Sequence, residues 1–258
     1  MSLKTVLLIG SAPDAMRARA FDTTAVSTIV AINNAWRVRD DWDYLVFPQD
    51  FPDERRPVPR RAQKFIEAHD YVPANNAYGG IIYAGATMAF TAAYWILHTL
   101  KPDLLLVTGC DMIYDQKLGP THFYGRGTAD PLRKDPTLQS LEAKATRLML
   151  LAARQGCLCA NLSPRADSRL TFPRIAAETM ATGLAQQRFQ ELERLAARHD
   201  DAKVTGILAQ EASLGQFVAS GNYWDNDFKI DSKALFDIDM AWRGTAYPHR
   251  SALRRSAS

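Results

Sequence analysis

Histidine, tyrosine and carboxylate side chains gather in the stretch behind a short apolar run, residues 104–107. Asp111 follows that run closely. The polar loop behind it carries Tyr114, His122 and Tyr124. A histidine titrates near neutral pH, so it can take or give a proton as a general base or acid. We interpret His122, the one histidine in a loop of this kind, as a catalytic or ligand-contacting residue; the alternative is a structural hydrogen bond.

A tight turn near the amino terminus has the pattern of a phosphate site. The apolar run 5–9 ends in Gly10, Ser11 and Ala12, and a polar stretch follows. Where a strand enters a helix through such a turn, free backbone amides point outward and favour a phosphate. A dinucleotide-binding motif would place a glycine where Ala12 stands, so this pattern is less specific. A strand-to-helix turn without a ligand is the alternative.

Polar residues also follow the next two apolar runs. Asn33 and Asn34 come directly after the run 28–32, and Asp50 closely follows the run 44–47. Two amides at a strand end can match the donor and acceptor edges of a base or a sugar. They can equally cap the following turn. Polar residues at three successive strand ends favour a genuine site, because one such strand end alone would mean little.

A second glycine turn precedes the most apolar run of the sequence, residues 88–100. This turn consists of Gly85, Ala86 and Thr87. Its glycine would let the backbone approach a ligand closely, and Thr87 is a reasonable N-cap for a helix. Turn, helix, strand and loop thus follow one another between residues 79 and 127. These are the parts of an open α/β site, in which ligands bind just outside the carboxyl ends of the strands.

The alternation of strand and helix patterns in the first two thirds of the chain predicts a parallel sheet with right-handed crossovers. Continuous apolar runs are typical of strands that are buried on both faces. We therefore expect an α/β fold, with a Rossmann-like, three-layer nucleotide-binding domain over residues 1–173. The expected strands are 5–9, 28–32, 44–47, 104–107 and 157–162, the expected helices are 60–69, 88–100 and 140–155, and residues 71–78 are expected to be irregular.

The pattern changes in the last third of the chain, where we expect a helical extension and tail over residues 174–258. Residues 176–198 and 204–218 have amphipathic helical patterns, which predict a helical hairpin turned around residues 199–203. Residues 221–247 are aromatic and acidic without clear periodicity. This irregular tail could wrap back over the main domain or join copies of the chain into a homo-oligomer.

Composition excludes several classes of protein. With 258 residues, of which 47% are hydrophobic, the chain suits one large domain or one domain with an appendage. The formal net charge of +3 is too mild to suggest a nucleic-acid partner. Cys110, Cys157 and Cys159 lack the spacing of a zinc site or a disulfide framework. No segment has the pattern of a transmembrane helix or a signal peptide, so we expect a cytoplasmic protein.

Several of these motifs together resemble a known family. Residues 5–14, a strand followed by Gly-Ser-Ala-Pro-Asp, are similar to the strand-Gly-x-Gly-Pro-Ser opening of small bacterial sialyltransferases. Residues 33–34 (Asn-Asn) resemble their Cys-Asn-Gln. The turn Tyr-Ala-Gly-Ala-Thr at residues 83–87 looks like their Thr-Ser-Gly, and in both a helix and a strand follow. The strand then ends in Thr-Gly-Cys-Asp-Met-Ile-Tyr at residues 108–114, which looks like their Ser-Gly-x-Asp-Phe-Tyr. 6-Hydroxymethylpterin pyrophosphokinase-like proteins share this order of turns, helix and strands. The resemblance covers roughly residues 4–170.

The resemblance to sialyltransferases implies a glycosyltransferase that uses a nucleotide-sugar donor of the CMP-sialic-acid type, with an acceptor that the sequence does not identify. The first glycine turn, the two asparagines and the second glycine turn would bind the donor. Tyr114 and Tyr124 would contact the donor phosphate, and His122 would deprotonate the acceptor hydroxyl. No metal cofactor would be required.

The sequence departs from the sialyltransferase pattern, and two other functions stay open. Ala12 and Asp14 replace a glycine and a serine of the family, and Asp50 stands near one of its neutral asparagines. A carboxylate there suits the pyrophosphokinase-like branch, whose members use magnesium and ATP. Asp50 and Asp111 would then hold the ion. The third hypothesis is a non-catalytic module that binds a nucleotide or a sugar.

Overall fold

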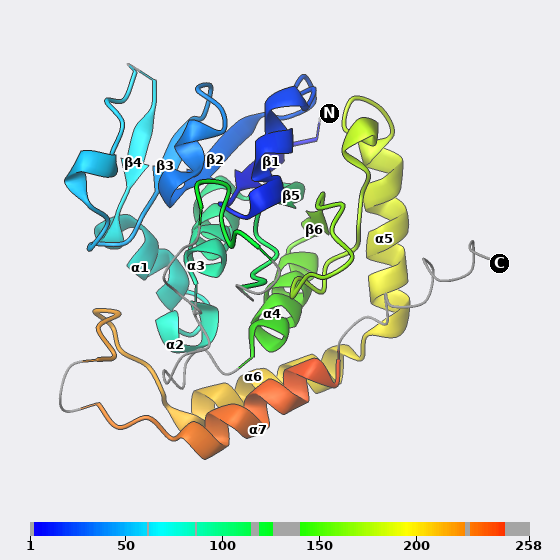
Figure 1. The fold of residues 1–258 in the computed structure, drawn as a ribbon. Coiled ribbons are helices and arrows are strands. Elements are labelled where there is room, and N and C mark those ends of the chain that lie inside the picture. Colours follow the sequence, from blue (N-terminus) through cyan, green and yellow to red (C-terminus); the bar gives the residue numbers. More distant parts are fainter. Residues whose placement is uncertain are drawn as a thin grey trace.

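Six parallel strands form one central sheet in the computed structural model, which describes residues 3–60, 62–85, 87–114, 119–125, 140–224 and 228–245. Their spatial order is β4-β3-β2-β1-β5-β6 (Figure 1). The direction in which strands are added along the chain therefore changes between β1 and β5. The prediction of an α/β, Rossmann-like fold is confirmed. The strands are β1 (Thr5–Ile9), β2 (Thr28–Ile32), β3 (Tyr44–Val46), β4 (Lys64–Ile66), β5 (Leu104–Thr108) and β6 (Leu158–Asn161).

The core lies along the central strands, because their side chains are apolar on both faces of the sheet. All residues of β1, β5 and β6 are buried. In the middle of the sheet, Leu7 of β1 lies beside Ile29 of β2 on one side and Leu106 of β5 on the other. A parallel sheet that is covered on both faces requires such continuous apolar runs.

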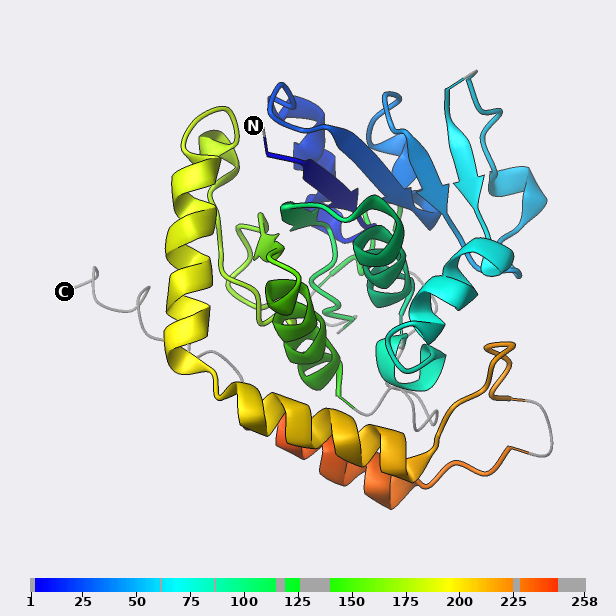
Figure 2. The ribbon, with the colours of Figure 1, turned by 180° about the vertical axis from the view of Figure 1, so that it is seen from behind.

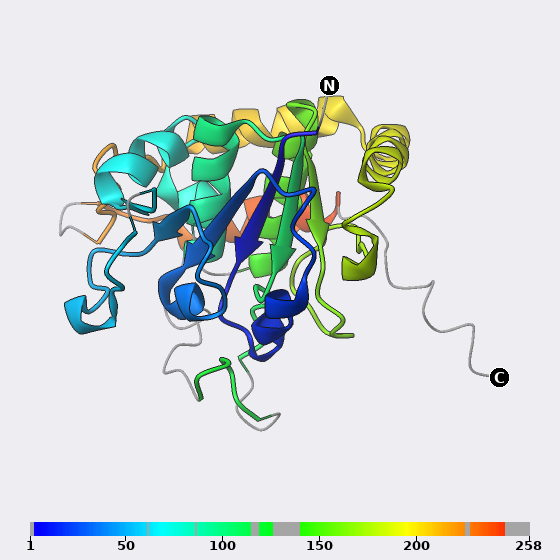
Figure 3. The same ribbon diagram turned by 90° about the horizontal axis from the view of Figure 1, so that it is seen from above.

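The two faces of the sheet have unequal covers, as Figure 3 shows from above. Short 3₁₀ helices, η1 (Pro13–Ala20) and η2 (Asn33–Arg37), lie on one face, where they contact β5, β2 and β3. α-Helices cover the opposite face (Figures 1 and 3). They are α1 (Ala68–Asn76), α2 (Ile81–Ala84), α3 (Met88–Trp95), which continues into a π-helical turn (Ile96–Leu100), and α4 (Leu141–Arg154).

The segment between β3 and α3 differs from the prediction. Residues 60–69 were expected to be helical, but residues 64–66 form the edge strand β4, in which Phe65 pairs with Leu45 of β3. The helix begins later, at Ala68, where the amide of Glu67 donates to the carboxylate of Asp70 (3.0 Å). The expectation of an irregular segment over residues 71–78 is therefore wrong as far as Asn76. These residues form a strand and not a helix because they pair with β3, a contact between segments distant in the sequence.

The C-terminal third is helical, and its hairpin is confirmed in part. The helices α5 (Leu184–Arg198) and α6 (Asp201–Leu214) meet at a bend instead of lying side by side (Figures 1 and 2). The antiparallel pair is formed by α6 and α7 (Ser232–Arg243), and α7 packs against α4. Residues 221–247 were expected to be irregular, which is wrong for α7. Leu235, Ile238 and Trp242 give α7 its buried face.

A buried polar cluster holds α6 and α7 against α4. We call it the anchor, and it consists of Tyr94, Arg147, Glu211 and Trp242. The guanidinium of Arg147 forms an ion pair with Glu211 (2.7 Å) and donates to the hydroxyl of Tyr94 (2.8 Å). The indole of Trp242 donates to Glu211 (2.8 Å). Burial raises the pKa of Tyr94 to about 12. Each charge of the anchor is thus met by a partner inside the protein.

The division into residues 1–173 and 174–258 stays a prediction, although the anchor joins the two parts through Arg147 and Glu211. Among the described helices, none combines the length and the hydropathy needed to cross a membrane. The pair α6 and α7 adds a further layer outside α4, whereas α5 lies beside the edge strand β6 (Figure 1).

Candidate functional site

The turns behind β1 and β5 meet at the carboxyl edge of the sheet, where the strand order reverses and open α/β sheets bind their ligands. Gly10 follows β1 and Gly109 follows β5. A Cβ atom on Gly10 would lie 2.3 Å from the carbonyl oxygen of Gly109, so the two backbones leave no room for a side chain. Gly109 also has a φ of +68°, which favours glycine. The amide of Ala12 donates to the Gly109 carbonyl (2.8 Å), which joins the turns.

A hollow of about 120 Å³ opens at this point. It is small beside the roughly 300–1,000 Å³ of typical ligand pockets, so within the described residues it suits one group of a larger ligand. Its wall combines most of the residues that the sequence singled out, and they come from four separate segments of the chain. They are Gly10, Ser11, Ala12, Asn33, Thr87, Tyr114, His122 and Tyr124.

His122 lies beside two tyrosines in the wall of the hollow. Its ring stacks on Tyr124 at 5.0 Å between centroids, and Tyr114 lies at 6.2 Å. The amide of Phe123 donates to the carbonyl of Ser11 (3.0 Å), which fixes the histidine loop against the turn behind β1. Burial lowers the pKa of His122 below its ordinary 6.5. The imidazole is therefore mostly neutral at pH 7, as a general base must be.

Thr121 bears on which nitrogen of His122 can act as a base. Its hydroxyl oxygen lies 2.9 Å from Nδ1 of His122, and the residue is 4% exposed. When Nδ1 carries the proton and donates it to Thr121, Nε2 keeps a free lone pair. In that tautomer Nε2 can accept a proton from a bound hydroxyl group. A side chain that orients the imidazole in this way is part of many catalytic bases.

Two non-glycine residues at the hollow have positive φ. Asn33, the first residue of η2, has a φ of 52°, and Met112, behind β5, has a φ of 56°. Such residues are uncommon, and backbone strain of this kind clusters at functional sites. The side-chain oxygen of Asn33 is buried and finds no hydrogen-bond partner among the described residues. It is thus a buried acceptor beside the hollow that no described residue satisfies.

The amino terminus of α3 forms another part of the wall. Thr87 is the N-cap of α3, and Met88 and Ala89 follow it at the hollow. The first amides of a helix have no partner within the helix and attract anions. The Thr87 side chain makes no capping hydrogen bond; its hydroxyl instead contacts the sulfur of Met112 at 3.6 Å. Ala86, a predicted binding residue, lies outside the described residues.

Three other predicted binding residues do not line the hollow. Asn34 is buried, with 4% exposed. Gly85 ends α2, and a Cβ atom there would lie 2.5 Å from the Ile81 carbonyl, so local packing explains this glycine without a ligand. Asp50 is exposed behind β3. Of the three, only Asn34 directly follows a residue that lines the hollow, Asn33.

Asp111 is buried beside the hollow and bound to Ser163. It is 1% exposed, and the Ser163 hydroxyl donates to it at 2.6 Å. Asp14 lies 3.1 Å from the same hydroxyl. Burial and the neighbouring charge of Asp111 raise the pKa of Asp14 above its ordinary value. Asp14 thus contacts Ser163 and does not line the hollow, which limits its repulsion of a bound phosphate.

The proposed pair of magnesium ligands is not brought together. Asp50 follows β3 and Asp111 follows β5, with β2 and β1 between them. Three strand spacings amount to roughly 14 Å. One carboxylate is exposed and the other is buried against Ser163, so they share no cavity. Among the residues that the structure describes, no group of three or more histidine, cysteine or acidic side chains is placed to hold a metal ion.

Sequence patterns missed three residues of this site: Gly109, Met112 and Thr121. Gly109 follows β5 as Gly10 follows β1, and this repetition was a usable signal. Thr121 directly precedes His122, so its contact with the ring could have been anticipated. Nothing in the sequence signals the positive φ of Met112, because the tertiary packing of its loop imposes it.

Comparison of the chain with protein-family models, with curated proteins and with solved structures finds no match. The resemblance to sialyltransferases therefore depends on the short motifs of the sequence alone.

Proposed function

We propose that the protein is a glycosyltransferase-like enzyme that binds a nucleotide-activated sugar of the CMP-sialic-acid type at the hollow. His122 serves as the general base of this reaction, and no metal ion takes part. One observation carries the proposal: a neutral, oriented imidazole and two tyrosines line the same hollow, at the edge where this sheet type binds its ligands.

The chemistry assigns a role to each side chain. Nε2 of His122 takes the proton from the acceptor hydroxyl while the hydroxyl oxygen attacks the anomeric carbon of the donor sugar. The bond between this carbon and the donor phosphate breaks, and cytidine monophosphate leaves with the bonding electron pair. The hydroxyl groups of Tyr114 and Tyr124 stabilise the charge that develops on the phosphate. The amides at the start of α3 favour the same anion.

Distances and burial favour this proposal over a magnesium-dependent pyrophosphokinase. That alternative requires Asp50 and Asp111 to share an ion, and the fold separates them. A binding module without catalysis would use the same hollow. It differs in that the donor binds but cytidine monophosphate is not released from it.

The test measures binding and turnover separately. Cytidine monophosphate should stabilise the protein equally with magnesium and with chelator. Release of cytidine monophosphate from the sugar donor should fall roughly 10²–10⁴-fold in His122→Ala, the usual contribution of a general base. The exposed His69→Ala variant is the matched control and should keep full activity.

The pH profile should report the same histidine. Because burial lowers the pKa of His122, turnover should stay constant around pH 7 and fall only below pH 6.5. Full turnover in His122→Ala would overturn its role as a base. Absence of any shift with cytidine monophosphate would overturn the choice of donor. A shift that depends on magnesium and ATP would favour the pyrophosphokinase alternative.

A further inference from the structure

A second cavity lies on the thinly covered face of the sheet. It has a volume of about 490 Å³, within the range of small-molecule sites. We call it the arginine groove, and the residues that matter here are Arg19, Trp36, Arg37, Arg39, Val58 and Arg60. The carboxyl-terminal end of η2 forms one wall, and Pro57, Val58, Arg60 and Gln63 form another.

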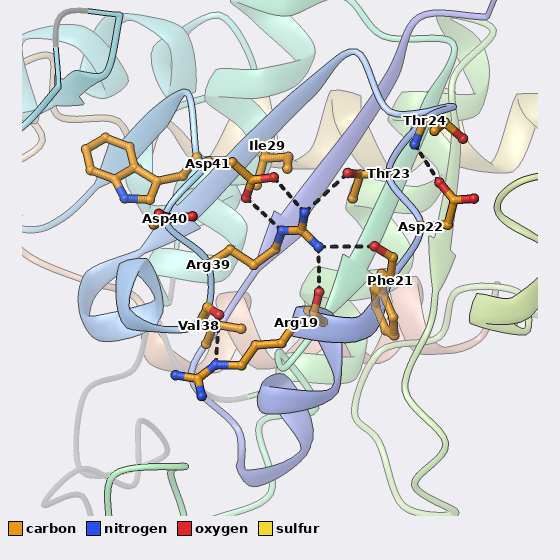
Figure 4. A network of polar contacts seen from close by, with 12 residues as sticks. Arg19, Phe21, Asp22, Thr23, Thr24, Ile29, Val38, Arg39, Asp40 and Asp41 are labelled. Atoms are coloured by element: carbon orange, nitrogen blue, oxygen red, sulfur yellow. Dashed lines mark hydrogen bonds and ion pairs between the residues drawn. The ribbon is translucent and has the colours of Figure 1, made fainter.

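At one end of the groove, two arginines are neutralised by aspartates. Arg39 makes two hydrogen bonds to the Asp41 carboxylate, at 2.8 and 2.6 Å (Figure 4). Its remaining donors go to the backbone carbonyls of Ala18 and Phe21 and to the Thr23 hydroxyl. Figure 4 shows how these contacts tie the loop before β3 to the end of η1. In the same way Arg60 pairs with Asp40 at 2.8 Å. These two arginines shape the groove and add little net charge.

The other two arginines keep their charge. Arg19 donates to the carbonyls of Val38 (3.1 Å) and Arg37 (3.0 Å), which holds its guanidinium in place (Figure 4 shows the first contact). Arg37 stacks its guanidinium over the Trp36 ring at 5.3 Å. In the described ranges, no carboxylate lies within ion-pair distance of Arg19 or Arg37. The guanidinium of Arg19 is held in place and keeps free donors for an anionic group, and that of Arg37 lies beside an aromatic ring. Together they suit an anionic group that is attached to a ring.

The groove and the hollow share one short helix. Asn33 begins η2 at the hollow, and Arg37 ends it at the groove. A 3₁₀ helix rises about 2 Å per residue, so the Cα atoms of Asn33 and Arg37 lie roughly 8 Å apart along its axis. A saccharide that is held in the groove by its anionic group has to span this helix to bring a hydroxyl toward His122.

From this arrangement we infer that the arginine groove binds an anionic saccharide, a sugar that carries a phosphate or a carboxylate, as the acceptor of the transfer. Arg19 and Arg37 hold the anion, and Trp36 and Val58, which is 92% exposed, offer apolar surface to the ring. The acceptor role rests on the proposed function. Binding in the groove does not, because none of its residues takes part in binding the donor.

The experiment titrates the whole protein with glucose 6-phosphate, glucuronate and neutral glucose by calorimetry at low ionic strength. At least one anion should bind about tenfold or more tightly than glucose, since hydrogen bonds to charged groups exceed neutral ones by about that factor. Arg37→Ala, at an exposed position, should weaken this binding about tenfold, and Arg19→Ala should do the same. Arg17→Ala is the matched control, because Arg17 lies exposed on η1 outside the groove and should leave binding unchanged.

Four outcomes would overturn the inference. They are equal binding of the anions and glucose, binding that neither arginine variant weakens, inorganic phosphate binding as tightly as glucose 6-phosphate, and displacement of the bound anion by cytidine monophosphate. Failure of the proposed function looks different. If cytidine monophosphate does not bind while arginine-dependent saccharide binding persists, the groove stands and its role as an acceptor site falls.

Discussion

The anchor beneath α4 and the hollow at the carboxyl ends of β1 and β5 both bury polar side chains, and they differ in how these groups are satisfied. In the anchor, Arg147 and Trp242 each donate a hydrogen bond to Glu211. Around the hollow, side-chain oxygens of Asn33 and Asp111 are buried without a partner among the described residues. A buried oxygen without a partner costs about 1–3 kcal/mol, so these two groups oppose folding where those of the anchor do not. The comparison separates a polar cluster whose groups satisfy one another from one in which some groups lack a partner.

The largest expected effect comes from breaking the anchor. Arg147→Met leaves Glu211 buried without its cation, which should lower the free energy of unfolding by about 3–5 kcal/mol. Urea denaturation followed by circular dichroism measures it. The double variant Arg147→Met/Glu211→Leu should recover part of the loss, because it leaves no unpaired charge but deprives the indole N–H of Trp242 of its acceptor. A loss below about 1 kcal/mol in the single variant would mean that the anchor is not what holds α6 and α7.

A smaller effect should come from Asp239, a neighbour of the anchor whose carboxyl group is poorly compensated. Burial raises its pKa to about 6, although the charge of Lys144 opposes the rise. A raised carboxyl pKa lowers stability as the pH increases from 3.8 to about 6, and the penalty stays constant above that. Asp239→Asn removes the charge.

Asp239→Asn should therefore be more stable than the original protein above pH 6, by on the order of 2–3 kcal/mol, and equally stable below pH 3.8. Urea denaturation at pH 8, pH 5 and pH 3.5 checks the trend. A less stable variant at pH 8 would show that the attraction of Lys144 outweighs burial, and that Asp239 belongs to the anchor after all.

The smallest effect on stability is expected at the hollow. In Asn33→Gly, relief of the positive φ should offset the added freedom of glycine in the unfolded chain, leaving stability within about 0.5 kcal/mol. Binding of cytidine monophosphate should nevertheless weaken about tenfold, because the amide is lost. Thermal denaturation and calorimetry measure the two quantities. A stability loss above about 1 kcal/mol with unchanged binding would show that Asn33 is a structural cap. The contrast between the anchor and the hollow would then not hold for this residue.

Local pattern was sufficient for the buried strands and for the polar residues that follow them. Residues 5–9, 28–32 and 104–107 read as strands because, apart from Thr5 and Thr28, every side chain is apolar, and burial on both faces follows from this pattern. Pattern was insufficient for β4, a strand of three residues whose pairing with β3 is non-local. It also missed α7, because the apolar spacing of Leu235, Ile238 and Trp242 is short and surrounded by other aromatic residues.

The sequence by itself determined which residues end the strands, because strand patterns and turn residues are local properties. It therefore indicated Gly10, Ser11, Asn33 and His122 as candidates before any contact was known. Only the tertiary structure decided which of them share a cavity. The strand order places β1 beside β5 and keeps β3 away from both, so Ser11 and His122 meet while Asp50 and Asp111 do not. Strand order is a property of contacts between residues far apart in the chain, and no local pattern contains it.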